Sequence, residues 1–282
     1  MKAFLGTGLL GANFTRALIS RGEQVHVWNR TFSKAKELEQ YGAKAFEDAS
    51  QAVRNASIVH VALKDDATVD DALNAAEPGL QAGTIIADHT TTSVEGAINR
   101  INEWKGKGFL YQHAPVFMGP SNALKSTGFM LVSGDQDLVK KLTPDLSAMT
   151  GKLLNFGNEP GKAAAMKLTG NCFLVGFTGA VADMLAFAHS LNVSDKDLLN
   201  LFSEWNPGAS TLSRIRRITE EDLTKPTWTL DMARKDTGLF LKHASEKGVD
   251  LQLIQQVAKR MDESIAKGHG QDDWMIFGKP GE

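Results

Sequence analysis

Residues 2–11, which read "KAFLGTGLLG", place Gly6, Gly8 and Gly11 directly after a short apolar run. An amphipathic stretch, "ANFTRALISRG" (12–22), follows at once. The apolar run predicts a β-strand, and the amphipathic stretch predicts a helix. In such a unit Gly6 permits a tight turn, Gly8 lets the backbone approach a phosphate, and Gly11 lets the helix pack close to the strand. The stretch therefore predicts an open α/β sheet that begins with a phosphate-binding loop.

The rest of the first half alternates short β-rich runs with amphipathic stretches such as "SKAKELEQYG" and "TVDDALNAAE". Strands that alternate with helices predict an α/β fold of the Rossmann type, a doubly wound, mostly parallel sheet with helices on both faces. The runs that we expect to form strands are 2–6, 24–29, 57–63, 83–88, 109–116, 129–134 and 152–156.

The pattern changes after Gly157, because residues 162–267 show helical periodicity and no convincing strand. The segment "GNEPG" (157–161) has the composition of a hinge. We therefore predict two domains, a Rossmann-type domain over 1–160 and an all-helical domain over 161–282.

Composition and charge are those of an ordinary soluble protein. Of 282 residues, 42% are hydrophobic and 23% charged, and the net charge of -2 gives no indication of nucleic acid or an anionic membrane as partner. The most apolar run, 172–182, looks too short to span a bilayer. The single cysteine, Cys172, excludes an internal disulfide, and we expect a buried thiol in a cytoplasmic protein. The histidines are scattered without metal-ligand spacing, so we expect no metal.

The second predicted strand ends in "WNRTFSK" (28–34). A site for NAD usually has a carboxylate here, which would repel the 2′-phosphate of NADP. This chain has neutral Asn29 and then Arg30, Thr31, Ser33 and Lys34, whose cationic and hydroxyl groups would bind that phosphate. We favour NADP over a merely solvated basic turn. The residues predicted to contact it in the loop and this turn are Gly6, Thr7, Gly8, Leu9, Leu10, Gly11, Asn29, Arg30, Thr31 and Lys34.

A long apolar stretch, 161–188, carries Lys167 and Asn171 near its start. Four residues apart on a helix, the two side chains project from one face. Burying an ammonium group costs several kcal/mol unless it is compensated, so the pair needs an explanation. One explanation is a polar pair that faces a cleft between domains, and the other is a lysine that snorkels to the surface.

With the glycine loop, "WNRT", "DHTTTS" (88–93), "APV" (114–116) and the Lys-x-x-x-Asn helix in this order, the chain resembles the β-hydroxyacid dehydrogenase family. That family includes 3-hydroxyisobutyrate dehydrogenases and glyoxylate/succinic semialdehyde reductases. The resemblance covers essentially the full length and implies NADP-dependent hydride transfer to or from a small aldehyde, ketone or hydroxyacid.

The resemblance also implies roles for individual residues. Lys167 would be the general acid or base, and Asn171 would position the substrate. Thr91 would lie beside the nicotinamide and the substrate, with Thr90 and Thr92 as neighbours. Further cofactor contacts would come from Leu63, Lys64 and, in the helical domain, Lys235.

The chain departs from the family pattern after "APV". Family members usually continue with Ser-Gly-Gly or Ser-Gly-Ser, which binds the substrate carboxylate, whereas this chain has Phe117 and Met118 before Gly119. The two bulky side chains would narrow and dry the pocket, or they could turn into the core. We take Phe117, Met118 and Gly119 as substrate-site residues, together with Thr91, Lys167 and Asn171. Elsewhere, Ser126 and Ala163 stand where glycines are usual.

Three functions remain open on the sequence. The first is an NADPH-dependent carbonyl reductase, or hydroxyacid dehydrogenase, with Lys167 as acid. The second is an imine reductase, which the apolar Phe117 and Met118 favour and Lys167 opposes. The third is a non-catalytic NADP-binding interaction module, which the presence of Lys167 also opposes. The long apolar helix predicts a homodimer or a higher homo-oligomer.

Overall fold

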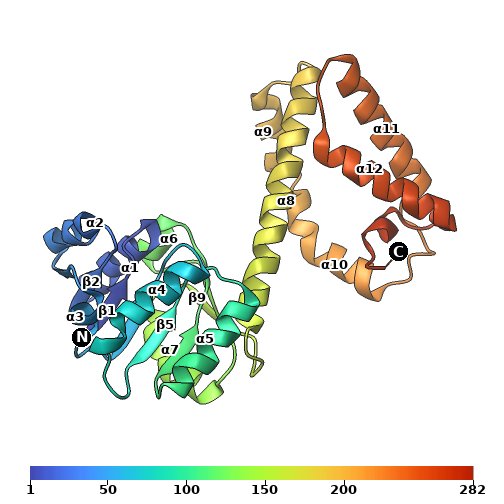
Figure 1. Ribbon diagram of the computed structural model, residues 1–282. Helices are drawn as coiled ribbons and strands as arrows, with labels where there is room; N and C mark the ends of the chain where they lie inside the picture. Colours follow the sequence, from blue (N-terminus) through green and yellow to red (C-terminus); the bar gives the residue numbers. More distant parts are fainter. Residues whose placement is uncertain (282) are drawn as a thin grey trace. The chain divides into compact units, whose positions relative to one another are not determined.

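The chain forms two compact units in the computed structural model, which describes residues 1–281 (Figure 1). The first unit comprises Met1–Cys172, and the second begins at Phe173. The border between them falls inside the long helix α8, Lys162–Ser190. The domain border predicted at 160/161 lies just before this helix.

The first unit is built on a parallel sheet with the strand order β3-β2-β1-β4-β5-β6. All its neighbouring strands run parallel, so helices must connect them across the faces of the sheet. The predicted doubly wound Rossmann-type fold is confirmed. The strands are β1 Lys2–Leu5, β2 Val25–Trp28, β3 Lys44–Phe46, β4 Ile58–Val61, β5 Ile85–Asp88 and β6 Leu110–His113.

A second, three-stranded sheet follows in the same unit, with the order β7-β8-β9. Its strands are β7 Val116–Phe117, β8 Phe129–Val132 and β9 Lys152–Asn155. Strand β7 runs antiparallel to β8, with Phe117 opposite Phe129, and β8 runs parallel to β9. The sequence prediction missed β3 and β7, and it extended one continuous strand across the break between β6 and β7.

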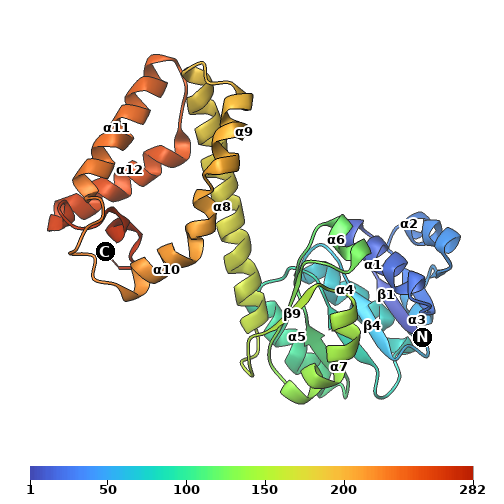
Figure 2. The same ribbon diagram turned by 180° about the vertical axis from the view of Figure 1, so that it is seen from behind.

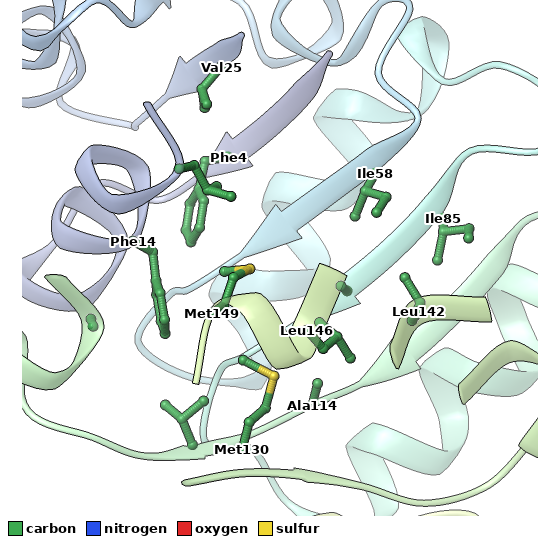
Figure 3. Packing of buried hydrophobic residues seen from close by; sticks show 14 of the residues in the cluster. Phe4, Phe14, Val25, Ile58, Ile85, Ala114, Met130, Leu142, Leu146 and Met149 are labelled. Carbon is green, nitrogen blue, oxygen red and sulfur yellow. The ribbon is translucent and has the colours of Figure 1, made fainter. Parts of the chain in front are cut away.

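Helices cover both faces of the main sheet, as the opposite views in Figures 1 and 2 show. On one face, Phe4 of β1 stacks with Phe14 of α1, and both belong to a buried cluster that extends to Leu142 of α7 (Figure 3). On the other face, residues of α3, α4 and α5 pack together, including the fully buried Trp104. The helices of this unit are α1 Leu9–Ser20, α2 Phe32–Lys36, α3 Ala49–Val53, α4 Asp66–Ala76, α5 Val94–Gly106, α6 Pro120–Lys125 and α7 Gln136–Ala148, with 3-10 turns at Glu37–Tyr41 and Glu77–Gly79.

The second unit is helical, and its described residues form no strand, only an isolated bridge between Thr229 and Asp273. Leu230, Ala233, Met261 and other apolar side chains form its buried cluster. The predicted all-helical second half is confirmed. Its elements are the later part of α8, then α9 Asp195–Glu204, α10 Thr211–Glu220, α11 Leu230–Glu246, α12 Gln252–Ser264, and short turns at Pro207–Ser210, Ile265–His269 and Trp274–Gly278.

Helix α8 differs from the sequence expectation in two respects. Its 29 residues are long and apolar enough to cross a membrane by length and composition, so the expectation that the apolar segment is too short is wrong for the helix as a whole. Cys172 is exposed, not buried as expected. Phe173, Leu174 and Val175 beside it are exposed as well, because nothing in the described chain covers this part of the helix.

Candidate active site

The glycine loop has the backbone geometry that its sequence predicts. Gly6 has a φ of 95°, in the left-handed region that favours glycine, and a Cβ here would overlap the Ala62 carbonyl. At Gly11 a Cβ would overlap the Gly6 carbonyl, so α1 can approach β1 closely only with glycine here. Around Gly8 there is open space, which leaves its backbone free to meet a ligand.

The start of helix α1 is suited to an anion. Gly8 is its N-cap residue, so no side chain accepts from the first backbone N–H groups, and its first turn contains no acidic residue. The hydroxyl of Thr7 is buried without a hydrogen-bond partner in the described part of the chain. The loop therefore combines unused donors with the positive end of a helix dipole.

Asn29 at the end of β2 connects the loop to the next turn. Its Oδ1 accepts from the Thr7 backbone N–H at 3.0 Å, and its Nδ2 donates to the Thr31 carbonyl at 3.0 Å. The side chains of Arg30, Thr31 and Lys34 are exposed around this turn. The turn is neutral at Asn29 and positive at its rim, which is the charge pattern that a 2′-phosphate requires.

A cleft of about 620 Å³ opens above the loop within the first unit. It contains both the glycine loop and Lys167, which are far apart in the sequence. Its lining residues are Gly6, Gly8, Leu9, Leu10, Gly11, Asn29, Ala62, Leu63, Lys64, His89, Thr90, Thr91, Val116, Met118, Pro120 and Lys167.

Lys167 lies in the first turns of α8 and is only 8% exposed. Its Nζ donates to Asn171 Oδ1 at 3.0 Å, one helical turn further on. The same Nζ lies 4.3 Å from the centroid of the Phe117 ring, a cation–π contact. Because burial disfavours the charged form, the pKa of Lys167 is lowered from 10.5. The snorkelling alternative is therefore wrong: the amine stays inside and faces the cleft.

The loop after β5 is held by a buried polar network. Asp88 Oδ1 accepts from the Thr90 backbone N–H at 2.9 Å, and Asp88 Oδ2 accepts from the Tyr111 hydroxyl at 2.6 Å. Arg100 of α5 donates to that hydroxyl at 3.1 Å. The Thr90 hydroxyl in turn accepts from the Leu63 backbone N–H at 3.0 Å. The network fixes the segments that carry Leu63 and Thr91 into the cleft.

His89 lines the cleft and is hydrogen-bonded to a second buried histidine, His60. Its Nδ1 lies 2.9 Å from the Ala114 carbonyl, which can only accept, so this nitrogen carries a proton. Its Nε2 lies 3.0 Å from His60 Nδ1. Burial lowers the pKa of both imidazoles, so both are neutral and His60 donates to His89. The remaining nitrogen, His60 Nε2, is an acceptor without a partner among the described residues.

The predicted site residues fall into two groups by position. Those that line the cleft are Gly6, Gly8, Leu9, Leu10, Gly11, Asn29, Leu63, Lys64, Thr91, Met118 and Lys167. Phe117 and Asn171 contact Lys167 directly. Those that do not line it are Phe117, Asn171, Thr7, Arg30, Thr31, Lys34 and Gly119. Lys235 lies on α11 of the second unit, exposed and 3.1 Å from Asp236, so its proposed contact with the cofactor stays a prediction.

Four lining residues were given no part in the site by the sequence prediction: Ala62, His89, Val116 and Pro120. A fifth, Thr90, was named only as a neighbour of Thr91. His89, Thr90 and Val116 lie inside the motifs "DHTTTS" and "APV", whereas Ala62 and Pro120 are adjacent to predicted residues. The carboxyl ends of β4 and β5 bring residues 62–64 and "DHTTTS" together, and the start of β7 adds Val116. The motifs therefore indicated where the site lies. Which side chains reach the cleft is decided by how the strand ends are arranged in the fold, which the sequence alone does not show.

Two family profiles match almost the entire chain. The NAD binding domain of 6-phosphogluconate dehydrogenase matches residues 2–157, and the NAD-binding domain of NADP-dependent 3-hydroxyisobutyrate dehydrogenase matches residues 161–277. The chain belongs to the β-hydroxyacid dehydrogenase family. As a member of this family it is an oxidoreductase that acts on hydroxyl or carbonyl groups, and its cofactor is NADP.

Individual relatives agree with the family. The 3-sulfolactaldehyde reductase of Escherichia coli is 26% identical over 277 residues, covering 96% of this chain and 92% of the relative. Glyoxylate/succinic semialdehyde reductase 2 of Arabidopsis thaliana is 29% identical over 204 residues, covering 71% of this chain and 57% of the relative. An imine reductase from Myxococcus stipitatus, solved with NADP+, has the same fold, with a TM-score of 0.90 at 20% identity and coverage of 99% and 98%.

The β-hydroxyacid dehydrogenase family's cofactor fits the residues of this chain. The open space at Gly8 and the uncapped start of α1 suit the pyrophosphate, and Asn29, Arg30 and Lys34 suit the 2′-phosphate. Leu63, Thr91 and Lys167 line the same cleft, where a nicotinamide would complete the site.

Proposed function

We propose that this protein reduces a small aldehyde or ketone with NADPH, that Lys167 is the general acid, and that Asn171 positions the amine and the substrate. The observation that carries the proposal is the shared cleft: the buried amine of Lys167 and the glycine loop line the same cavity of about 620 Å³. No other cation among the cleft's lining residues is buried, because Lys64 is 85% exposed and lies 3.7 Å from Asp65.

The chemistry requires a hydride and a proton. When bound, the reduced nicotinamide supplies the hydride to the carbonyl carbon. As the carbon–oxygen π bond breaks, negative charge develops on the oxygen, and the Lys167 ammonium stabilises it and donates a proton from Nζ. Lys167 is then a neutral amine, which regains a proton from water. Burial lowers the pKa of Lys167, so this proton leaves more easily than from an exposed lysine.

The named relatives favour an aldehyde. They are reductases of 3-sulfolactaldehyde and of glyoxylate or succinic semialdehyde. We carry over to this chain only the reacting group, an aldehyde or ketone carbon with a short substituent. Phe117 packs over the amine of Lys167, and Met118 lines the cleft, so we expect the substituent to be short.

Imine reduction is the second candidate, because the ring of Phe117 and the side chain of Met118 make the wall beside Lys167 apolar. The two reactions differ in the proton that they need. A carbonyl oxygen requires a donor in the transition state, which Lys167 provides, whereas an iminium ion arrives already protonated.

A substrate panel separates the candidates. Oxidation of NADPH is followed at 340 nm with straight-chain aldehydes, small ketones and cyclic imines, and NADH serves as the cofactor control. We expect aldehydes to be turned over with NADPH. Turnover of cyclic imines, with aldehydes and ketones inert, would replace carbonyl reduction by imine reduction.

We propose that a second copy of the chain covers the exposed apolar part of α8. Phe173, Leu174 and Val175 are between 54% and 72% exposed, a large apolar surface for a monomer. A bilayer is a poorer partner, because Lys167 and Asp183 leave an uncharged stretch, 168–182, of only about 22 Å. Asp183 is also engaged within the second unit, where its Oδ2 accepts from the Ile254 N–H at 3.0 Å. We therefore propose a homodimer in the cytoplasm, not a membrane protein.

Light scattering on the purified protein tests the dimer. We expect twice the mass of one chain at micromolar concentration, and a lower mass for the Val175→Asp variant. A monomer of the unmodified chain, or recovery of the protein from the membrane fraction, would contradict the proposal.

A further inference from the structure

Phe117 occupies a defined position beside the reactive amine. It lies in β7, opposite Phe129 of β8, and its ring centroid is 4.3 Å from Lys167 Nζ. The ring also packs against Gly170 of α8, where any Cβ would overlap it. Because strand β7 and helix α8 hold the ring between them, it forms a fixed wall next to the amine.

Two sides of the Lys167 amine are already in contact with other residues of the chain. Asn171 Oδ1 accepts one N–H at 3.0 Å, and the Phe117 ring covers another side. Within residues 1–281, no acidic side chain forms an ion pair with Lys167. An ammonium has three N–H donors, so one N–H remains to donate to a ligand.

A carboxylate on the substrate would compete with the carbonyl oxygen for the remaining N–H of Lys167. The segment that carries Phe117 adds three apolar residues to the lining of the cleft: Val116, Met118 and Pro120. Buried carboxylates need a cation or several hydrogen-bond donors, and neither Phe117 nor these three residues has a side-chain donor. A carboxylate bound beside this segment would therefore turn to the amine that must hold the carbonyl oxygen. A carboxylate paired with Lys167 would therefore bind with its carbonyl group misplaced.

We propose that Phe117 sets the substrate class of this site: its ring and the adjoining Met118 exclude a substrate carboxylate, so that the cleft takes uncharged carbonyl compounds with a short apolar substituent. This inference rests on the proposed function for the identity of the reacting group. It adds that charge on the substituent, and not its length alone, decides which compounds bind productively.

Calorimetric titration of the NADP-loaded protein with butanamide and butanoate tests the inference without turnover. The two ligands have the same carbon chain and differ in charge. We expect the amide to bind the unmodified protein at least about ten-fold more tightly. In Phe117→Ser, which adds a hydroxyl and opens the wall, we expect this ratio to fall about ten-fold, and in Phe117→Leu, which keeps the bulk, to persist.

Phe129→Ser is the matched control, because Phe129 lies opposite Phe117 on the neighbouring strand and is 46% exposed. We expect it to leave the ratio unchanged. Tighter binding of butanoate by the unmodified protein would overturn the inference, and so would a Phe117→Ser variant with an unaltered ratio. Since the readout is binding, these results are distinct from a failure of carbonyl reduction in the substrate panel.

Discussion

Asn29 shows at the residue scale why a neutral amide suits this position. One side of its carboxamide accepts from the Thr7 N–H, and the other donates to the Thr31 carbonyl. An aspartate could make the first bond but not the second, since a carboxylate has no donor. It would also place a negative charge next to the exposed guanidinium of Arg30, where we expect the 2′-phosphate.

Replacing Arg30 should therefore weaken the binding of NADPH and not that of NADH. In Arg30→Ala, the loss of a charge-assisted contact should raise the KM for NADPH about ten-fold or more and leave that for NADH nearly unchanged. Steady-state kinetics with both cofactors measure the effect. Arg54→Ala, which removes another exposed arginine, is the control. Equal losses with NADPH and NADH would show that Arg30 does not distinguish the two.

The sequence predicted the cleft residues best where a local motif requires one residue type. Gly6 and Gly11 could be placed because their backbone leaves no room for a Cβ. His89 was not predicted, although "DHTTTS" contains it, because its position is fixed by hydrogen bonds to His60 and Ala114, which are distant in the sequence. Ser126, where a glycine is usual, has a φ of 52°, so the glycine preference is local backbone geometry that serine tolerates here.

At the scale of single elements, helix α5 supports the site through Arg100. Its side chain is 2% exposed and donates to Asp66, Asp70 and Tyr111. Burial by itself would lower the pKa of Arg100, but these partners raise it above its ordinary value, so the guanidinium stays charged. Asp66 also accepts from the Ser93 N–H at 2.9 Å, which ties the α5 N-terminus to α4.

Arg100→Met should be destabilising, because Asp66, Asp70 and Tyr111 each lose a hydrogen bond from the buried guanidinium. Because Asp66 and Asp70 are 35% and 48% exposed, we expect the loss of these charged hydrogen bonds to cost about 1.5–3 kcal/mol, which urea unfolding can measure. Lys107→Met, at the end of the same helix, removes exposed ion pairs with Glu77 and Glu103 and should cost less than about 1 kcal/mol. Similar losses in the two variants would show that burial does not govern the contribution of Arg100.

The elements that the sequence missed are the shortest ones. Strand β3 has three residues and β7 two, too few to establish an alternating pattern. Both form because longer neighbours provide the ladder, β2 for β3 and β8 for β7. Since β7 carries Phe117, this missed strand is also what fixes the ring over Lys167.

At the scale of the whole molecule, the first unit buries three histidines that are neutral in the folded chain. His60, His89 and His113 are at most 3% exposed, and burial is the main cause that lowers their pKa values from 6.5. Below about pH 6.5 the unfolded chain binds protons at these positions while the folded chain does not. The free energy of unfolding therefore falls as the pH decreases through this range.

Unfolding measured at pH 7.5 and 5.5 should show this loss. Each histidine can contribute up to about 1.4 kcal/mol per pH unit, at pH values between its folded and unfolded pKa. Urea titrations followed by circular dichroism give the free energies. A free energy of unfolding that is flat between the two pH values would contradict buried neutral imidazoles.

The rate of NADPH oxidation in a single turnover by Lys167→Met, with the aldehyde preferred by the unmodified enzyme, tests the central claim most directly. Methionine keeps much of the side-chain volume and removes the proton donor. We predict a rate lower by about 10²–10⁴-fold with little change in NADPH binding, and a normal rate for Lys162→Met, whose ion pair with Glu159 is exposed. An unchanged rate in Lys167→Met would contradict the assignment of Lys167 as the acid.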